Sequence, residues 1–120
     1  MAHTIYMGED GIVRTAIIGD MTEEDARAFV RDAQPFLAAS LAENPTHVLH
    51  DSSRSGKYTS QARKVILSVF SDPRIGKVAG FGPRPYSRVL FTFFIKASGR
   101  TNVRLFATKA EALTWLNSRE

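Results

Sequence analysis

The chain has 120 residues, a formal net charge of +4 at pH 7 and no cysteine, which excludes disulfide bonds, thiol catalysis and cysteine-ligated metals. Its length predicts one domain, residues 1–120, with a core of its own. No apolar run approaches the roughly 20 residues that span a bilayer, and the first residues lack the basic and apolar segments of a signal peptide. The expected compartment is the cytoplasm.

The charge is unevenly distributed along the chain. Residues 1–53 carry three basic and nine acidic side chains, a net charge of −6, whereas residues 54–120 carry thirteen basic and three acidic ones, a net charge of +10. A basic half can attract phosphates, acidic proteins or anionic lipid headgroups, and contact between oppositely charged copies explains the same pattern. The aromatic residues lie in apolar periodic runs rather than along a basic stripe, so nucleic acid is not an expected partner.

The N-terminal third predicts a hairpin followed by a helix. Residues 3–7 and the β-branched run 12–18 are strand candidates, and Asp10-Gly11 between them is a turn signal. Thr22 predicts a helix N-cap, with Asp25 completing a capping box. The apolar face of this helix recurs at three- and four-residue spacings: Ala26, Phe29, Val30, Ala33, Phe36, Leu37 and Leu41. Pro35 is expected to kink or split it, and Asn44-Pro45 to end it.

The rest of the chain predicts strands alternating with helices. Strands are expected at residues 47–51, 75–81 and 103–107, and residues 52–57 are expected to form a polar loop. Helices are expected from residue 59 or 60 to Asp72-Pro73, over 86–97, and after the capping box Thr108–Glu111. The run 86–97 is apolar enough to suit a strand, but its length and the stop at Gly99 favour a helix.

The predicted element order is therefore β-β-α-β-α-β-α-β-α. Strand–helix–strand units imply right-handed crossovers and parallel pairing, whereas the N-terminal hairpin adds an antiparallel edge. The sequence thus predicts an α/β fold, with a mixed, mostly parallel sheet of about five strands and four helices.

Three stretches carry a family resemblance. They are GDMTEE at residues 19–24, VLHD at 48–51 and FATKAEALTWL at 106–116, the last with the pattern F-x-T-x-x-E-A-x-x-W-L. Together with the element order, they resemble the SpoIIAA-like (STAS/SEC14 domain) bacterial proteins, over nearly the whole chain. The resemblance implies the STAS-like fold of anti-sigma-factor antagonists. It also implies a regulatory, protein-interaction domain without catalytic activity or cofactor.

The segment after the third predicted strand is the main candidate site. Anti-sigma-factor antagonists carry a D-S-S-G-type motif here with a phosphorylated serine. Asp51, Ser52 and Ser53 match its start, but Arg54-Ser55 intervenes before Gly56. We expect residues 51–60 to be a docking, phospho-regulated or anion-binding site, although an ordinary polar loop explains the same residues. The candidate residues are Asp51, Ser52, Ser53, Arg54, Ser55, Lys57 and Tyr58.

The phenylalanine-rich run 86–97 supports an alternative function. Its rings can line a pocket for an apolar ligand, with Arg84, Tyr86 and Arg88 at the pocket mouth. Because SEC14-type relatives bind lipids, the resemblance implies a carrier or sensor of a small amphipathic or lipid-like anionic ligand. Core packing or a self-association face, as in a homodimer, explains the same rings.

The histidines do not predict a reactive site. His50, Asp51 and Ser52 include the residue types of a catalytic triad, but neighbours on a strand point to opposite faces. His47 and His50 lie on opposite faces for the same reason, so they do not form a metal pair. Gly56-Lys57 lacks the other residues of a phosphate-binding loop. We therefore expect no catalytic residues and no bound metal.

Overall fold

The computed structural model describes residues 2–119. Its elements, in chain order, are β1 (Ala2–Met7), β2 (Val13–Met21), α1 (Glu23–Ala38), β3 (Thr46–Asp51), β4 (Ser55–Tyr58), α2 (Ser60–Phe70), β5 (Ile75–Phe81), α3 (Pro85–Ser98), β6 (Val103–Phe106) and α4 (Lys109–Leu116). The four predicted helices and the mixed, mostly parallel sheet are confirmed, including the helix over the apolar run that ends at Gly99.

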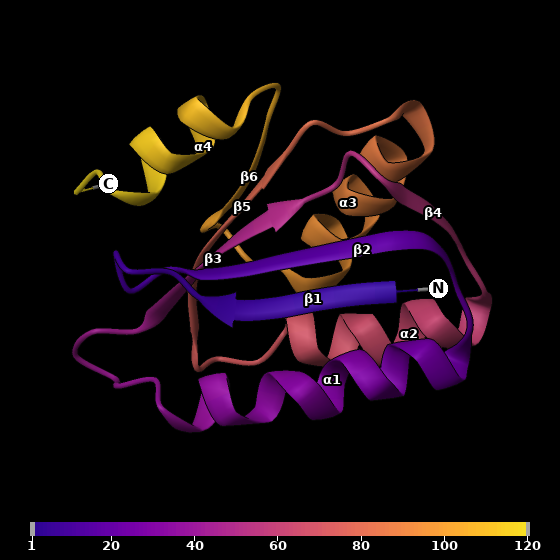
Figure 1. Cartoon of the computed structure of the whole chain (residues 1–120), viewed down its shortest axis with the longest axis horizontal. Coiled ribbons are helices and arrows are strands. Elements are labelled where there is room, and N and C mark those ends of the chain that lie inside the picture. Colours follow the sequence, from indigo (N-terminus) through magenta and orange to yellow (C-terminus); the bar gives the residue numbers. More distant parts are fainter. Residues whose placement is uncertain (1, 120) are drawn as a thin grey trace.

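The sheet has the strand order β1-β2-β3-β5-β6 (Figure 1). β1 pairs antiparallel with β2, as the hairpin signal predicted, and the other pairs along this path are parallel. β4 lies outside this strand order and pairs in parallel with the last residues of β2.

β4 corrects the predicted loop over residues 52–57. β2 runs on to Met21 rather than ending at Ile18, and its extension presents backbone groups that need partners. The Gly19 amide donates to the Arg54 carbonyl at 2.9 Å, and the Thr59 amide donates to the Met21 carbonyl at 3.1 Å. Residues 55–58 therefore form a strand despite their polar composition, and the sheet has six strands rather than about five.

Pro35 does not split α1, which runs without interruption to Ala38 and ends before the predicted Asn44-Pro45 stop. The proline lies in the last turn, so its missing N–H removes only one hydrogen bond near the helix end. The amide of the C-cap residue Ala39 then bonds the carbonyls of Leu37 and Pro35.

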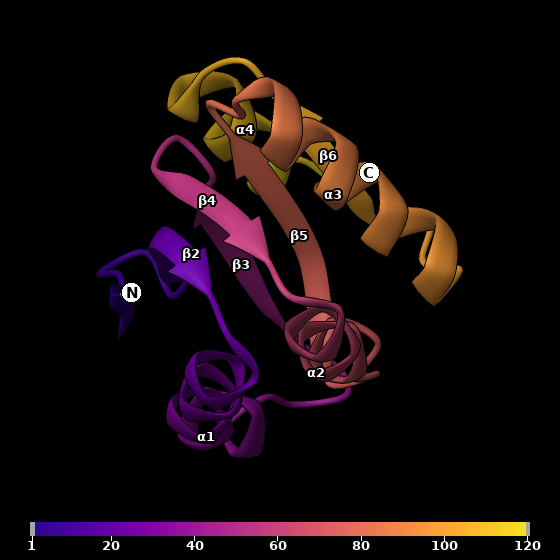
Figure 2. The same ribbon diagram turned by 90° about the vertical axis from the view of Figure 1, so that its right-hand side faces the viewer.

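The helices cover the two faces of the sheet unequally (Figure 2). α1, α2 and α3 share one core with β2, in which Ile17 and Met21 meet Phe29, Ile66 and Phe94. α4 covers the opposite face, where its buried residues pack against Leu49 and Ala79; those residues are Ala112, Trp115 and Leu116.

α4 is also held by a buried lysine. The Lys77 ammonium on β5 donates to the Trp115 carbonyl at 3.0 Å and lies 5.1 Å from the centroid of the Trp115 ring. Trp115 is therefore a core residue that anchors the helix. Among residues 2–119, no helix combines the length and the apolar character needed to cross a membrane.

Candidate functional site

The two predicted site segments lie next to each other at the carboxyl ends of β3 and β5. The Ser52 amide donates to the Phe81 carbonyl at 3.0 Å, and the Ser87 hydroxyl of α3 lies 3.4 Å from the Ser52 carbonyl, to which it donates. The rings of Tyr58 on β4 and Phe94 on α3 are 6.3 Å apart. In open α/β sheets this edge is the usual place for binding sites.

The start of the loop after β3 is ordered by Asp51. Its carboxylate accepts hydrogen bonds from the Ser53 amide at 2.8 Å and the Ser53 hydroxyl at 2.6 Å, and Arg54 lies 3.6 Å away. Burial opposes ionisation, but the Ser53 hydrogen bonds and the Arg54 charge outweigh it and hold the pKa of Asp51 below its usual range. A phosphate on Ser53 would stand beside this carboxylate, and β4 separates it from the α2 N-cap, Thr59.

Only part of the predicted contact segment is accessible. Ser52 and Ser55 are 2% and 5% exposed, and Tyr58 is also buried, which raises its pKa to about 12. Arg54 and Lys57 are exposed. The β2–β4 pairing is irregular: its register shifts between Gly19–Ser55 and Met21–Tyr58. This irregularity interrupts the alternation of side chains, so Ser55 and Tyr58 are both buried although they are three residues apart, and Lys57 is exposed.

The first turns of α3 present a second group of exposed residues. Arg84, Tyr86 and Arg88 point outward, whereas Ser87 between them is buried. Val89 and Phe93 lie farther along the helix and are 69% and 47% exposed. The sequence singled out Arg84, Tyr86 and Arg88 but not the exposure of Val89 and Phe93. The run 86–97 is apolar on all sides, so its pattern does not distinguish the core face from the exposed face.

A cavity of about 120 Å³ lies between the sheet and the helices α1, α2 and α3. Alternate residues of β3, Val48 and His50, line it from the sheet, together with Thr15 of β2. Phenylalanine rings line it from the helices: Phe29, Phe36, Phe70, Phe91 and Phe94. Two phenylalanines of α3, Phe91 and Phe94, thus border a cavity, but Arg84, Tyr86 and Arg88 are not among its lining residues.

His50 faces this cavity from β3. Thr15 is paired with His50 in the β2–β3 register, and its hydroxyl lies 2.7 Å from His50 Nδ1. The His50 ring stacks on the Phe91 ring, with 6.4 Å between the ring centroids. Burial lowers the pKa of His50 to about 4, so the imidazole is neutral at pH 7. Because Asp51 points to the other face, His50 bonds Thr15 rather than forming a catalytic relay.

The other strand histidine, His47, has a structural partner. Its Nδ1 accepts a hydrogen bond from the Lys77 amide at 2.8 Å. Burial and the nearby Lys77 charge lower the pKa of His47. Residues 2–119 contain no group of three or more histidine, aspartate or glutamate side chains placed to hold a metal ion.

The absence of a side chain at Gly80 leaves room for the Phe91 ring, which packs beside His50. A Cβ atom at Gly80 would lie 2.8 Å from Phe91 Cε2 and 2.9 Å from Leu105 Cδ1. We expect Gly80→Ala to lower the free energy of unfolding by about 1–3 kcal/mol, because extra volume in a packed core forces side chains aside. Urea unfolding measures this loss, and adding Phe91→Leu should recover part of it. Equal stability of Gly80→Ala and wild type would contradict the predicted clash.

A family model described as SpoIIAA-like matches residues 12–117, which is most of the chain. The chain belongs to the SpoIIAA-like family. The family expected from the three sequence stretches is therefore confirmed. None of the curated proteins compared with this SpoIIAA-like chain matches it.

Two solved structures share the fold of this SpoIIAA-like chain. The first is an uncharacterized protein of the DUF3478 family with a SpoIIAA-like fold from Shewanella loihica PV-4. Its sequence is 19% identical to this chain and the TM-score is 0.72. The alignment covers 96% of this chain and 92% of that protein. The second is the anti-sigma factor antagonist SpoIIAA in its unphosphorylated form, 15% identical with a TM-score of 0.67, over 98% of this chain and 99% of that one. At these identities the likeness concerns the fold.

Proposed function

We propose that this SpoIIAA-like chain is a regulatory domain that acts by docking on a protein partner and catalyses no reaction. Family membership supports a regulatory role, and one protein of the same fold is named as an anti-sigma factor antagonist. The observation that carries the proposal is the exposure of Val89 and Phe93 on α3, since large apolar side chains that remain exposed together mark interaction sites.

The docking surface combines α3 with the neighbouring β4 segment. We call it the β4–α3 surface and define it by its exposed residues: Arg54, Lys57, Arg84, Tyr86, Arg88, Val89 and Phe93. Its charged members are all basic, and Tyr86, Val89 and Phe93 on α3 supply its apolar part. Interfaces commonly combine an apolar core with a polar rim. The matching partner carries acidic residues around an apolar patch, because complementary charge guides association.

Substitutions in the apolar centre test this function. We expect the double variant Val89→Asp/Phe93→Asp to weaken partner binding by tenfold or more, since apolar residues at an interface centre dominate affinity. The measurement is capture of proteins from the native cell extract, followed by titration of the captured partner. Leu41→Asp, at another exposed apolar residue, is the matched control. Equal capture by the double variant and the control would contradict the proposal.

Two further measurements test whether this surface binds a second copy of the chain and whether phosphorylation regulates it. If light scattering of purified protein shows a dimer that the double variant loses, the occupant is a second copy of the chain. Ser53 is the accessible serine of the D-S-S start, since Ser52 is buried. A Ser53→Asp variant that changes capture while Ser53→Ala does not would support regulation by phosphorylation.

A carrier or sensor of a small amphipathic ligand is the second candidate function. The cavity between the sheet and α1–α3 favours it, because small-molecule sites are concave and mostly apolar with a few polar groups. Titration of the purified chain with toluene, followed by NMR, tests whether the cavity admits an apolar molecule.

A further inference from the structure

The wall of the cavity is apolar over most of its area and polar at one end. Four consecutive same-face residues run along it from the sheet: Thr46, Val48, His50 and Ser52. Near Ser52 the wall also includes Ser55 of β4 and Ser87 of α3. Near Thr46 it is formed by apolar side chains, among them Phe36 and Ile75. The carboxyl end of β3 therefore presents a cluster of hydrogen-bonding residues to the cavity: His50, Ser52, Ser55 and Ser87.

Two polar groups at this end lack partners. Ser52 is 2% exposed, and its amide and carbonyl are bonded to Phe81 and Ser87, but its hydroxyl has no hydrogen-bond partner among residues 2–119. The Nδ1 of His50 is occupied by Thr15, whereas Nε2 makes no hydrogen bond within the described part of the chain. Both residues line the cavity, so each group can form a hydrogen bond with a molecule bound there.

The size of the cavity limits this occupant. Its volume of about 120 Å³ approaches the roughly 150 Å³ of an apolar cavity that admits benzene. The space therefore suits a single ring or a chain of similar volume.

The charge of the wall limits the occupant further. Among residues 2–119, no lysine, arginine, aspartate or glutamate lines the cavity, and His50 is neutral at pH 7. An anion would be buried there without a counter-charge, which is strongly unfavourable. The cavity therefore favours neutral ligands over the anionic ones that the sequence suggested.

We propose that the cavity binds a small neutral molecule with a ring-sized apolar body and one hydroxyl group, which hydrogen-bonds to Ser52 and His50. A hydroxyl group both donates and accepts, so it can satisfy the serine and either form of the neutral imidazole. This inference rests on the second candidate function and adds the chemical class of the ligand.

Phenol and toluene are the matched probes, because they differ only in a hydroxyl and a methyl group. A wholly apolar cavity would bind toluene far more tightly, since phenol would lose the hydration of its hydroxyl. We expect the wild-type chain to bind phenol at least as tightly as toluene in NMR titrations. Benzoate, the anionic probe, should bind at least tenfold more weakly than phenol.

Ser52→Ala tests the polar contact directly. We expect it to weaken phenol binding about fivefold to tenfold, the range of one or two neutral hydrogen bonds, and to change toluene binding less than twofold. Ser53→Ala is the control, because that hydroxyl is bonded to Asp51 and does not line the cavity. The amide spectrum of each variant shows whether it remains folded, and the wild-type phenol-to-toluene ratio tests the inference without a variant.

The outcomes separate this inference from the function on which it rests. If toluene binds tightly and phenol far more weakly, or if Ser52→Ala leaves phenol binding unchanged, the hydroxyl-binding site is overturned while ligand binding in the cavity stands. Benzoate binding as tight as that of phenol overturns the preference for neutral ligands. If neither toluene nor phenol shifts any cavity resonance, both the inference and the carrier function fail.

Discussion

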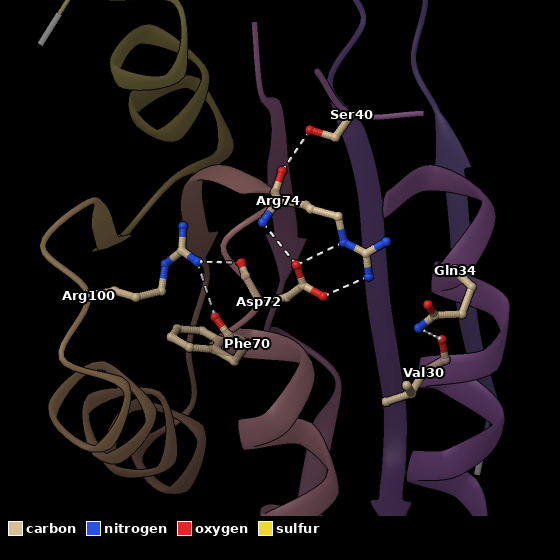
Figure 3. A network of polar contacts seen from close by, with 7 residues as sticks. All are labelled: Val30, Gln34, Ser40, Phe70, Asp72, Arg74 and Arg100. Atoms are coloured by element: carbon tan, nitrogen blue, oxygen red, sulfur yellow. Dashed lines mark hydrogen bonds and ion pairs between the residues drawn. The ribbon is translucent and has the colours of Figure 1, made fainter. Parts of the chain in front are cut away.

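Replacing Arg100 by methionine is expected to lower the free energy of unfolding by about 3 kcal/mol, because it removes several charge-assisted hydrogen bonds from one partly buried group. The guanidinium donates to the carbonyls of Asp72 at 2.9 Å, Ile75 at 2.7 Å and Gly76 at 2.7 Å. It also lies 3.4 Å from the Phe70 carbonyl at the end of α2 (Figure 3). Methionine keeps much of the apolar stem but removes the guanidinium donor from these carbonyls, of which Gly76 keeps a hydrogen bond from the Asn102 side chain.

The effect should depend on the shape of the guanidinium as well as its charge. Arg100→Lys is expected to lose part of the stability, since an ammonium on a single stem cannot reach carbonyls on both sides of the turn. Arg74→Met is the control, because Arg74 forms an exposed pair with Asp72 in the same turn, and exposed pairs contribute little (Figure 3). Urea unfolding of the three variants measures the differences. Equal losses in Arg100→Met and Arg74→Met would contradict the role given to Arg100.

Acidification from pH 7 to pH 4 is expected to remove about 3 kcal/mol of stability through His50 alone. Its pKa is lowered by burial from 6.5 to about 4 in the folded chain. Within this window the unfolded chain binds a proton that the folded chain excludes, so stability is fully present above pH 6.5 and falls as the pH drops toward 4. The magnitude follows from about 1.4 kcal/mol for each unit of pKa difference.

The His50→Asn variant isolates this contribution. Asparagine is uncharged throughout the range and offers an oxygen to the Thr15 hydroxyl, so the variant should lose less stability on acidification than wild type does. His47 and the carboxylates titrate in both proteins, so they cancel in the difference between the two pH profiles. His3→Asn is the control, because His3 lies on the edge strand β1 beside Asp32. Parallel profiles of wild type and His50→Asn would contradict the predicted linkage.

Local signals made most of the fold predictable. Thr22 with Asp25 and Thr108 with Glu111 form the predicted capping boxes, and Gly99 ends α3 in the left-handed conformation at φ 69°. Each of these features depends on residues within one or two turns of a helix. β4 was not predictable in the same way, because its pairing with β2 joins segments more than thirty residues apart in the chain.

The candidate site shows the same division between local and long-range effects. The alternation of side chains along a strand predicts that His50 and Asp51 face opposite ways. The hydrogen bond from His50 to Thr15 depends instead on the β2–β3 register, and the burial of Ser55 and Tyr58 depends on β4. The sequence therefore indicated a candidate segment but not which of its residues are accessible.

The pairing of β4 with β2 has a consequence for association. Arg54 and Lys57 lie on a backbone that is fixed by hydrogen bonds to Gly19 and to the Asp20 carboxylate, the latter at 2.8 Å from the Lys57 amide. A free loop would give up conformational entropy on binding, whereas this segment is preorganised. A partner bound at the proposed β4–α3 surface would therefore not have to order this segment on binding.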